Sequence, residues 1–171
     1  VSHLYQESQV DGVVAVGGAQ GTAMATAAMR ALPVGIPKVM VSTVASRNMA
    51  KTVGTKDITM IHSVADLLGV NSITGRVLDR AAGAVCGMVQ SDVKEINNHP
   101  PVIAASMFGN TTEAVGRARK MLEESGYEVL VFHATGAGGK TMESLIADGF
   151  FAASLDVTTT EWADELVGGV L

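Results

Sequence analysis

Short apolar runs that end in glycine, serine or threonine recur along the chain, and helical periodicity follows most of them. The runs are VVAV (13–16), KVMVS (38–42), the stretch 57–62, VIAASM (102–107), EVLVFHA (128–134) and AASLDV (152–157). Short, fully apolar runs are typical of parallel strands that are buried on both faces. Strands that alternate with helices of about 10–15 residues indicate βαβ units. The sequence therefore predicts an α/β fold.

The pattern of strands and helices occurs twice. The polar segment SDVKEINNHPP (91–101) separates the two occurrences and ends in a proline pair. We therefore predict two Rossmann-like lobes with parallel sheets in three αβα layers, at 1–95 and 96–171. The opening residues VSHLYQESQV have the spacing of the end of a helix, without an initiator methionine or a signal-peptide profile. We interpret the chain as an excised fragment whose first lobe is truncated at its start.

Composition excludes several classes of protein. Hydrophobic residues make up 47% and charged residues 17%, which argues against disorder. The net charge is −5, and no Lys/Arg cluster is present, so we expect no nucleic-acid partner. No apolar stretch approaches the ~20 residues that span a bilayer, so we expect no membrane partner. The single cysteine, Cys86, rules out an internal disulfide and favours a cytoplasmic location. Its apolar surroundings, AAGAVCGMV, predict a buried core thiol.

The turns after the strands are the best candidates for chemistry. In open parallel sheets, ligands bind beyond the carboxyl ends of the strands, and a helix amino terminus offers free N–H groups to a phosphate. The candidate phosphate-turn residues share this position and are Gly17, Gly18, Gly21, Thr22, Thr43, Ser46, Gly109, Thr111, Thr135, Gly136, Gly138, Gly139 and Lys140. Each turn alone is also explained by ordinary capping and turn formation. The threonines at 158–160, which follow AASLDV, form a fifth turn of this kind. Five such turns on one sheet edge favour a phosphate site.

One turn has an additional feature. Residues 134–141 read ATGAGGKT, which matches a loose phosphate-loop pattern except that Ala134 replaces its first glycine. Lys140 would then contact phosphate, and Asp156 at the end of a later strand would hold magnesium. Two alternatives stay open: Lys140 contacts phosphate without a P-loop fold, or it is a solvated lysine in the first turn of a helix.

Acid–base and metal candidates are few. His133 ends a strand and is a candidate catalytic group together with Lys140 and Asp156, although a satisfied core histidine explains it equally simply. Asp156 and Glu161 flank a threonine run and are candidate metal ligands. Helix capping by the threonines, with Glu161 as a first-turn acid, is the alternative explanation.

Several segments together resemble a family of uncharacterised proteins that includes the tomato mosaic virus resistance protein. They are GVVAVGGAQGTAMATAAMRALPVGIPKVMVSTVAS, ADLLGVNSITGRVLDRAAGAVCGMV, ASMFGNTTEAV, YEVLVFHATGAGGKTMESLI and DVTTTEWADELVGGV. The resemblance implies an ATP-binding amino-terminal domain of two lobes, followed by a separate carboxyl-terminal domain. It also implies that this chain is an internal piece of the amino-terminal domain, without the first βα unit and without whatever follows the GGV at 168–170.

We therefore expect a nucleotide-binding domain with ATP as the ligand and Mg²⁺ as a further candidate. Two other functions stay open at this point. One is an enzyme that acts on a small phosphorylated or carboxylated metabolite through His133, Lys140 and Asp156. The other is a protein–protein interaction module whose Ala- and Gly-rich faces pair subunits, and a homo-oligomer is expected on either view.

Overall fold

The computed structural model describes residues 1–91 and 99–169. The chain divides into two compact units, Val1–Val93 and Lys94–Leu171, which are described separately. The predicted lobe boundary between residues 95 and 96, and most of the predicted linker, lie outside the described residues.

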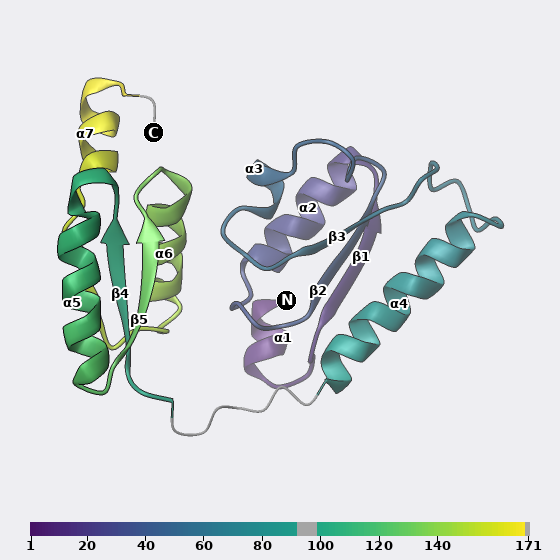
Figure 1. The fold of residues 1–171 in the computed structure, drawn as a ribbon. Coiled ribbons are helices and arrows are strands. Elements are labelled where there is room, and N and C mark those ends of the chain that lie inside the picture. The colour runs from purple at the N-terminus through teal and green to yellow at the C-terminus, as the bar shows by residue number, and fades with distance from the viewer. Residues whose placement is uncertain (92–98, 170–171) are drawn as a thin grey trace. The chain divides into compact units, whose positions relative to one another are not determined.

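The first unit is a parallel sheet between helices (Figure 1). Its elements are α1 (Ser2–Gln6), β1 (Val13–Gly17), α2 (Ala19–Arg30), β2 (Lys38–Ser42), α3 (Ala50–Val53), β3 (Thr59–His62) and α4 (Thr74–Gln90). The strand order is β1-β2-β3. Val13 pairs with Lys38 and Val39 with Thr59, so the carboxyl ends of the three strands lie at one edge of the sheet.

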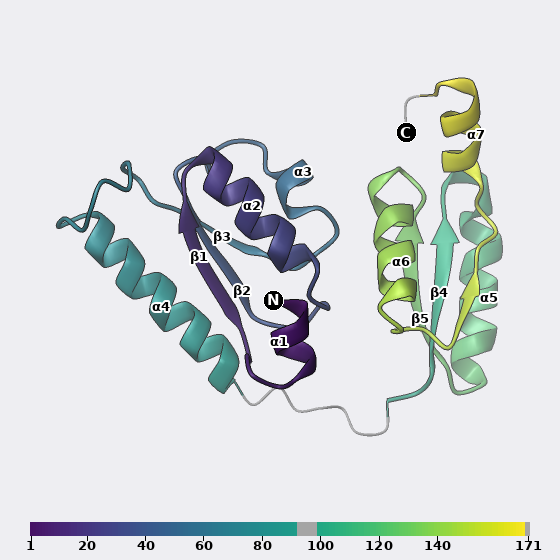
Figure 2. The ribbon, with the colours of Figure 1, turned by 180° about the vertical axis from the view of Figure 1, so that it is seen from behind.

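Alternate residues of β2 point to opposite faces of this sheet, and a helix covers each face. Met40 packs with Met29 of α2 and with Ile58 on one side. Val39 and Val41 pack with Ala81 of α4 on the other. The views from the front and from behind show α2 and α4 on opposite sides of the sheet (Figures 1 and 2).

The second unit has the same layered construction. Its elements are β4 (Val102–Met107), η1 (Gly109–Thr111), α5 (Thr112–Glu124), β5 (Glu128–His133), α6 (Ala137–Ala147), β6 (Ala153–Leu155) and α7 (Thr160–Val167). The strands are parallel in the order β5-β4-β6. Val115 of α5 packs with Ile103, Ala105 and Val129, and α6 also packs against β4 and β5. The predicted α/β fold with parallel sheets in αβα layers is confirmed.

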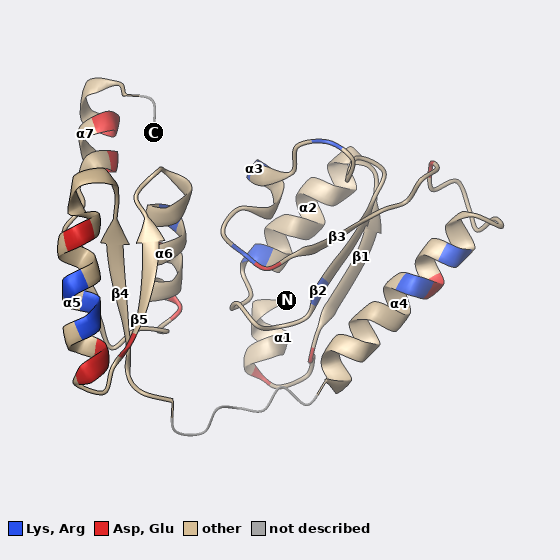
Figure 3. Cartoon of the chain, viewed as in Figure 1, with Lys and Arg blue, Asp and Glu red and all other residues tan. Residues whose placement is uncertain are grey.

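The surface of α5 carries charges of both signs (Figure 3). Arg117 pairs with Glu113 at 2.6 Å and Arg119 with Glu123 at 2.7 Å, each one helical turn apart. Such exposed pairs contribute little to stability and give the helix a mixed, solvated face.

One local prediction was wrong, because Cys86 is exposed instead of buried. The segment between β2 and β3 contains the short helix α3. The residues of α4 that pack on the sheet include Val77, Ala81, Val85 and Met88, and Cys86 lies off the stripe that this spacing defines. Among the described residues, no helix is both long and apolar enough to cross a bilayer.

Candidate functional site

The turn between β1 and α2 presents free backbone donors at the carboxyl edge of the first sheet. Gly18 is the N-cap of α2 in an extended conformation, and no side chain accepts a hydrogen bond from the first turn among the described residues. Gly18, Ala19 and Gln20 are exposed. An uncapped helix start of this kind carries partial positive charge and suits an anion.

Buried hydroxyl groups hold this turn against the end of β2. The Thr22 and Ser42 hydroxyl oxygens are 2.7 Å apart, and Ser42 Oγ accepts a hydrogen bond from the Val44 N–H at 3.1 Å. The Thr43 N–H donates to the Gly17 carbonyl at 3.2 Å. Because Thr22 is only 1% exposed, its hydroxyl lies behind the turn and positions it.

The glycines of this turn serve different purposes. A Cβ on Gly17 would lie 3.0 Å from the backbone of Gly21, so the bare Gly17 lets the strand end pack closely on the helix. A Cβ on Gly18 would meet only Thr43 Oγ1, at an ordinary contact distance of 3.7 Å. The Gly18 position is therefore open on the side where a ligand would approach.

The corresponding turn before α6 is filled by a side chain of the same chain. The Glu161 carboxylate accepts hydrogen bonds from the Gly136 N–H and, at 3.3 Å, from the Gly139 N–H. A Cβ on Gly139 would lie 1.8 Å from Glu161 Oε2. Glu161 thus occupies the position that the sequence predicts for a phosphate. It is also an acid in the first turn of its own helix, α7, as the alternative explanation expects, whereas its contact with the α6 turn was not predicted.

The remaining predicted residues of the second unit follow β4, β5 and β6. The Ser106 hydroxyl donates to the Asp156 carboxylate at 2.5 Å and accepts from the Thr158 N–H at 3.0 Å. The Thr111 and Thr158 hydroxyl oxygens are 2.8 Å apart, and Gly109 begins η1 with a positive φ of 51°. This network ties the ends of β4 and β6 together, and it gives Asp156 a structural partner.

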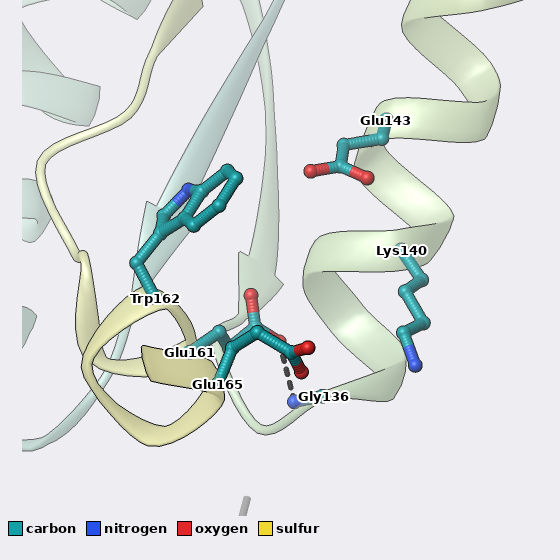
Figure 4. A pocket seen from close by; sticks show the side chains of 6 residues that line it. All are labelled: Gly136, Lys140, Glu143, Glu161, Trp162 and Glu165. Atoms are coloured by element: carbon teal, nitrogen blue, oxygen red, sulfur yellow. Dashed lines mark hydrogen bonds between the residues drawn. The ribbon is translucent and has the colours of Figure 1, made fainter. Parts of the chain in front are cut away.

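The three catalytic candidates are not gathered in one pocket. His133 is exposed at the end of β5, so the core-histidine explanation is wrong. Thr135 follows it in an exposed turn, and its N–H donates to the His133 carbonyl at 2.9 Å. Of the three candidates, Lys140 lines a pocket whose other residues are Gly136, Glu143, Glu161, Trp162 and Glu165. This pocket lies between α6 and α7 and has a volume of about 200 Å³ (Figure 4).

Neither metal candidate belongs to a metal-ligand cluster. Within 1–91 and 99–169, no group of three or more His, Cys, Asp or Glu side chains is arranged to hold a metal ion. Asp156 is bonded to Ser106 and Glu161 to the α6 turn.

Sequence reasoning missed several residues that shape these sites. They are Ser42, Ser106, Glu143, Trp162 and Glu165. Ser42 and Ser106 each lie at or near the end of a strand. Because ligands bind near strand ends in parallel sheets, this position could have marked both residues as candidates in the sequence. The approach of α7 to α6, which brings Trp162 and Glu143 to one pocket, depends on tertiary packing that no local pattern encodes.

The chain matches two family models in succession. Residues 1–94 match the N-terminal domain, and residues 100–171 the C-terminal domain, of Uncharacterised protein family UPF0261. The resemblance that we assigned to one amino-terminal domain therefore covers parts of both family domains, one for each unit.

Similar proteins occur in bacteria and in a plant. A UPF0261 protein of Clostridium tetani is 54% identical over 171 residues, which is 100% of this chain and 42% of the relative. A UPF0261 protein of Rhizobium meliloti is 44% identical over 98% of this chain and 42% of the relative. The tomato ToMV resistance protein Tm-1 from Solanum lycopersicum is 44% identical over 96% of this chain and 22% of the relative.

The chain thus spans less than half the length of these relatives. The two family models match successive parts of the chain, and the first alone covers more than half of it, so the chain belongs to the UPF0261 family.

Proposed function

We propose that the chain is a cytoplasmic nucleotide-binding domain and that the turn of residues 17–22 holds the phosphates of ATP, with Mg²⁺ as a companion ion. The observation that carries this proposal is the uncapped amino terminus of α2, exposed at the carboxyl edge of a parallel sheet. Open α/β sheets bind their ligands at this edge.

The contrast between the two glycine-rich turns supports the choice of site. At α6, the backbone amides already donate to the Glu161 carboxylate. At α2, the amides of the first turn have no side-chain acceptor in the described part of the chain. An anion that binds at α2 gains charge-assisted hydrogen bonds without displacing an internal group. Thr43 lies beside Gly18 and is placed to contact the same ligand.

Calorimetric titration with ATP, with and without Mg²⁺, tests the proposal on the wild-type chain and on two glycine variants. Gly18→Ala adds a methyl group that the fold accommodates at 3.7 Å but that stands where the phosphate would approach. We expect this variant to bind ATP at least ~10-fold more weakly, because a displaced charge-assisted contact costs about 1.5 kcal/mol or more.

Gly83→Ala on α4, outside the turn of residues 17–22, is the matched control. Its Cβ meets nothing within 4 Å, and alanine favours the helix, so ATP affinity should stay near that of the wild type. Circular dichroism verifies that each variant is folded. A folded wild-type chain that gives no heat with ATP, or a Gly18→Ala variant that binds ATP normally, would contradict the proposal.

We also propose that the chain self-associates through the first unit. Val14 and Val16 of the edge strand β1 are 48% and 49% exposed, on the face opposite the side where Val13 and Ala15 pack with the α2 cluster. Exposed apolar side chains at a sheet edge favour association. Sedimentation velocity over a range of concentrations should show a dimer or larger species that the double substitution Val14→Thr, Val16→Thr shifts toward monomer. A wild-type chain that is monomeric throughout would disprove self-association.

A further inference from the structure

The pocket between α6 and α7 has an aromatic wall and an excess of negative charge. Trp162 is the only tryptophan of the chain and is 61% exposed. Three of the six lining residues are glutamates, against one lysine. In Figure 4 the Glu143 carboxylate extends toward the Trp162 ring from the facing helix, whereas the Lys140 side chain extends away from the ring.

The three carboxylates are not equivalent. Glu161 is engaged by the amides of the α6 turn. Glu143 and Glu165 are exposed, and neither forms an ion pair among the described residues. Like charges that share a cavity repel one another. Lys140 lines the same pocket, but its side chain extends away from the Trp162 ring, and among the described residues it forms no ion pair with either carboxylate (Figure 4). A ligand that enters the cavity therefore meets two available carboxylates and an indole face.

This combination selects a ligand by charge and by shape. A phosphate or carboxylate ligand would be repelled by the glutamates, which sets this pocket apart from the turn of residues 17–22. A bare metal ion would need a cluster of ligating side chains, and none is arranged that way in the described residues. An alkylammonium group gains attraction from carboxylates and from the face of a tryptophan ring, and its hydrocarbon part can lie on the same ring.

We propose that this pocket binds a small organic cation, with Trp162 supplying the aromatic face and Glu143 and Glu165 the counter-charges. The cavity of about 200 Å³ accepts a compact ammonium compound. The inference is independent of nucleotide binding, because it uses residues of α6 and α7 and none of the turn between β1 and α2.

Trp162 itself provides the measurement, since all tryptophan fluorescence of the chain comes from this position. Choline chloride is titrated at constant ionic strength, and its neutral isostere 3,3-dimethyl-1-butanol is titrated in parallel. We expect a saturable fluorescence change with choline and none with the alcohol. An equal response to both compounds, or no saturable response to choline, would overturn the proposal.

Charge-neutral variants locate the response. Glu143→Gln and Glu165→Gln should each weaken choline binding by about fivefold, as expected for the loss of one partly exposed charge contact of ~1 kcal/mol. Glu124→Gln on the exposed surface of α5 is the control and should leave the affinity unchanged. Unchanged affinity in both pocket variants, or a saturable response to glucose of the same size as to choline, would show that the pocket does not select a cation.

Discussion

Replacing Gly138 with alanine is expected to destabilise the second unit by about 3 kcal/mol or more. An added Cβ would lie 1.8 Å from the His133 carbonyl oxygen and 2.7 Å from the His133 carbonyl carbon. These are backbone atoms at the end of β5, so relief of the clash requires movement of α6 away from the strand it covers. An added methyl group that clashes with backbone atoms, which cannot move aside, causes one of the larger losses in the free energy of unfolding. Urea denaturation of the variant and of the wild type measures this difference in the free energy of unfolding.

Two other glycines of the second unit make this prediction specific. Gly116→Ala on α5 places its Cβ where nothing lies within 4 Å, and we expect a gain of up to about 1 kcal/mol from helix propensity. Gly139→Ala meets only the flexible Glu161 side chain, which can swing away, so its cost should fall between the two. A Gly138→Ala variant as stable as Gly116→Ala would show that α6 does not pack on β5 as described.

Replacing Lys38 with methionine is expected to cost the first unit about 3 kcal/mol. The Lys38 side chain is fully buried at the start of β2, and its ammonium group donates to the Pro33 carbonyl at 2.7 Å, to the Ile36 carbonyl at 2.8 Å and to Asp57 Oδ1 at 2.7 Å. Methionine fills a similar volume but leaves these acceptors without their donor, and breaking such a buried pair is strongly destabilising. Lys51→Met at an exposed position of α3 should change stability by no more than about 0.5 kcal/mol.

The same contact predicts a dependence on pH. Partial burial alone would raise the pKa of Asp57, but the hydrogen bonds that it accepts from Lys38 and from the Gly35 N–H, together with the lysine charge, lower it below its ordinary value. A carboxyl group whose pKa is lower in the folded state stabilises the fold above its unfolded pKa and loses this contribution as pH falls through the folded value. The stability difference between the wild type and Lys38→Met should therefore be constant near neutrality and shrink below about pH 3.8. A difference that is unchanged under acid conditions would exclude this linkage.

Much of the fold could be predicted from sequence because its strands are short, apolar and framed by strong turn signals. The bounds of β2 and β4 match the residues expected for them. The exposure of Cys86 was missed because its neighbours along the sequence are apolar, while burial depends on which side of α4 faces the sheet. The burial of a residue on α4 therefore depends on its position around the helix axis and not on the composition of the neighbouring sequence.

The candidate sites were less accessible to sequence reasoning. The glycine-rich turns could be located because strand ends in parallel sheets share an edge. That Glu161 would fill the α6 turn could not be foreseen, since the contact joins Gly136 to a residue 25 positions away. The ion pair of Lys38 has the same origin, because Asp57 lies 19 positions away in the sequence and meets the ammonium group only after folding.

The carboxylate of Glu161 has a consequence for competition at the α6 turn. As a covalently attached occupant, it meets the Gly136 and Gly139 amides at an effective concentration of ~1 mM or higher. This effective concentration exceeds that of a dissolved anion at micromolar levels by a factor of about 1,000. A dissolved anion therefore competes poorly for these amides, even when its shape suits them. The amides at the start of α6 could bind an anion from solution, but in this chain they bind the Glu161 carboxylate instead and so connect α6 to α7.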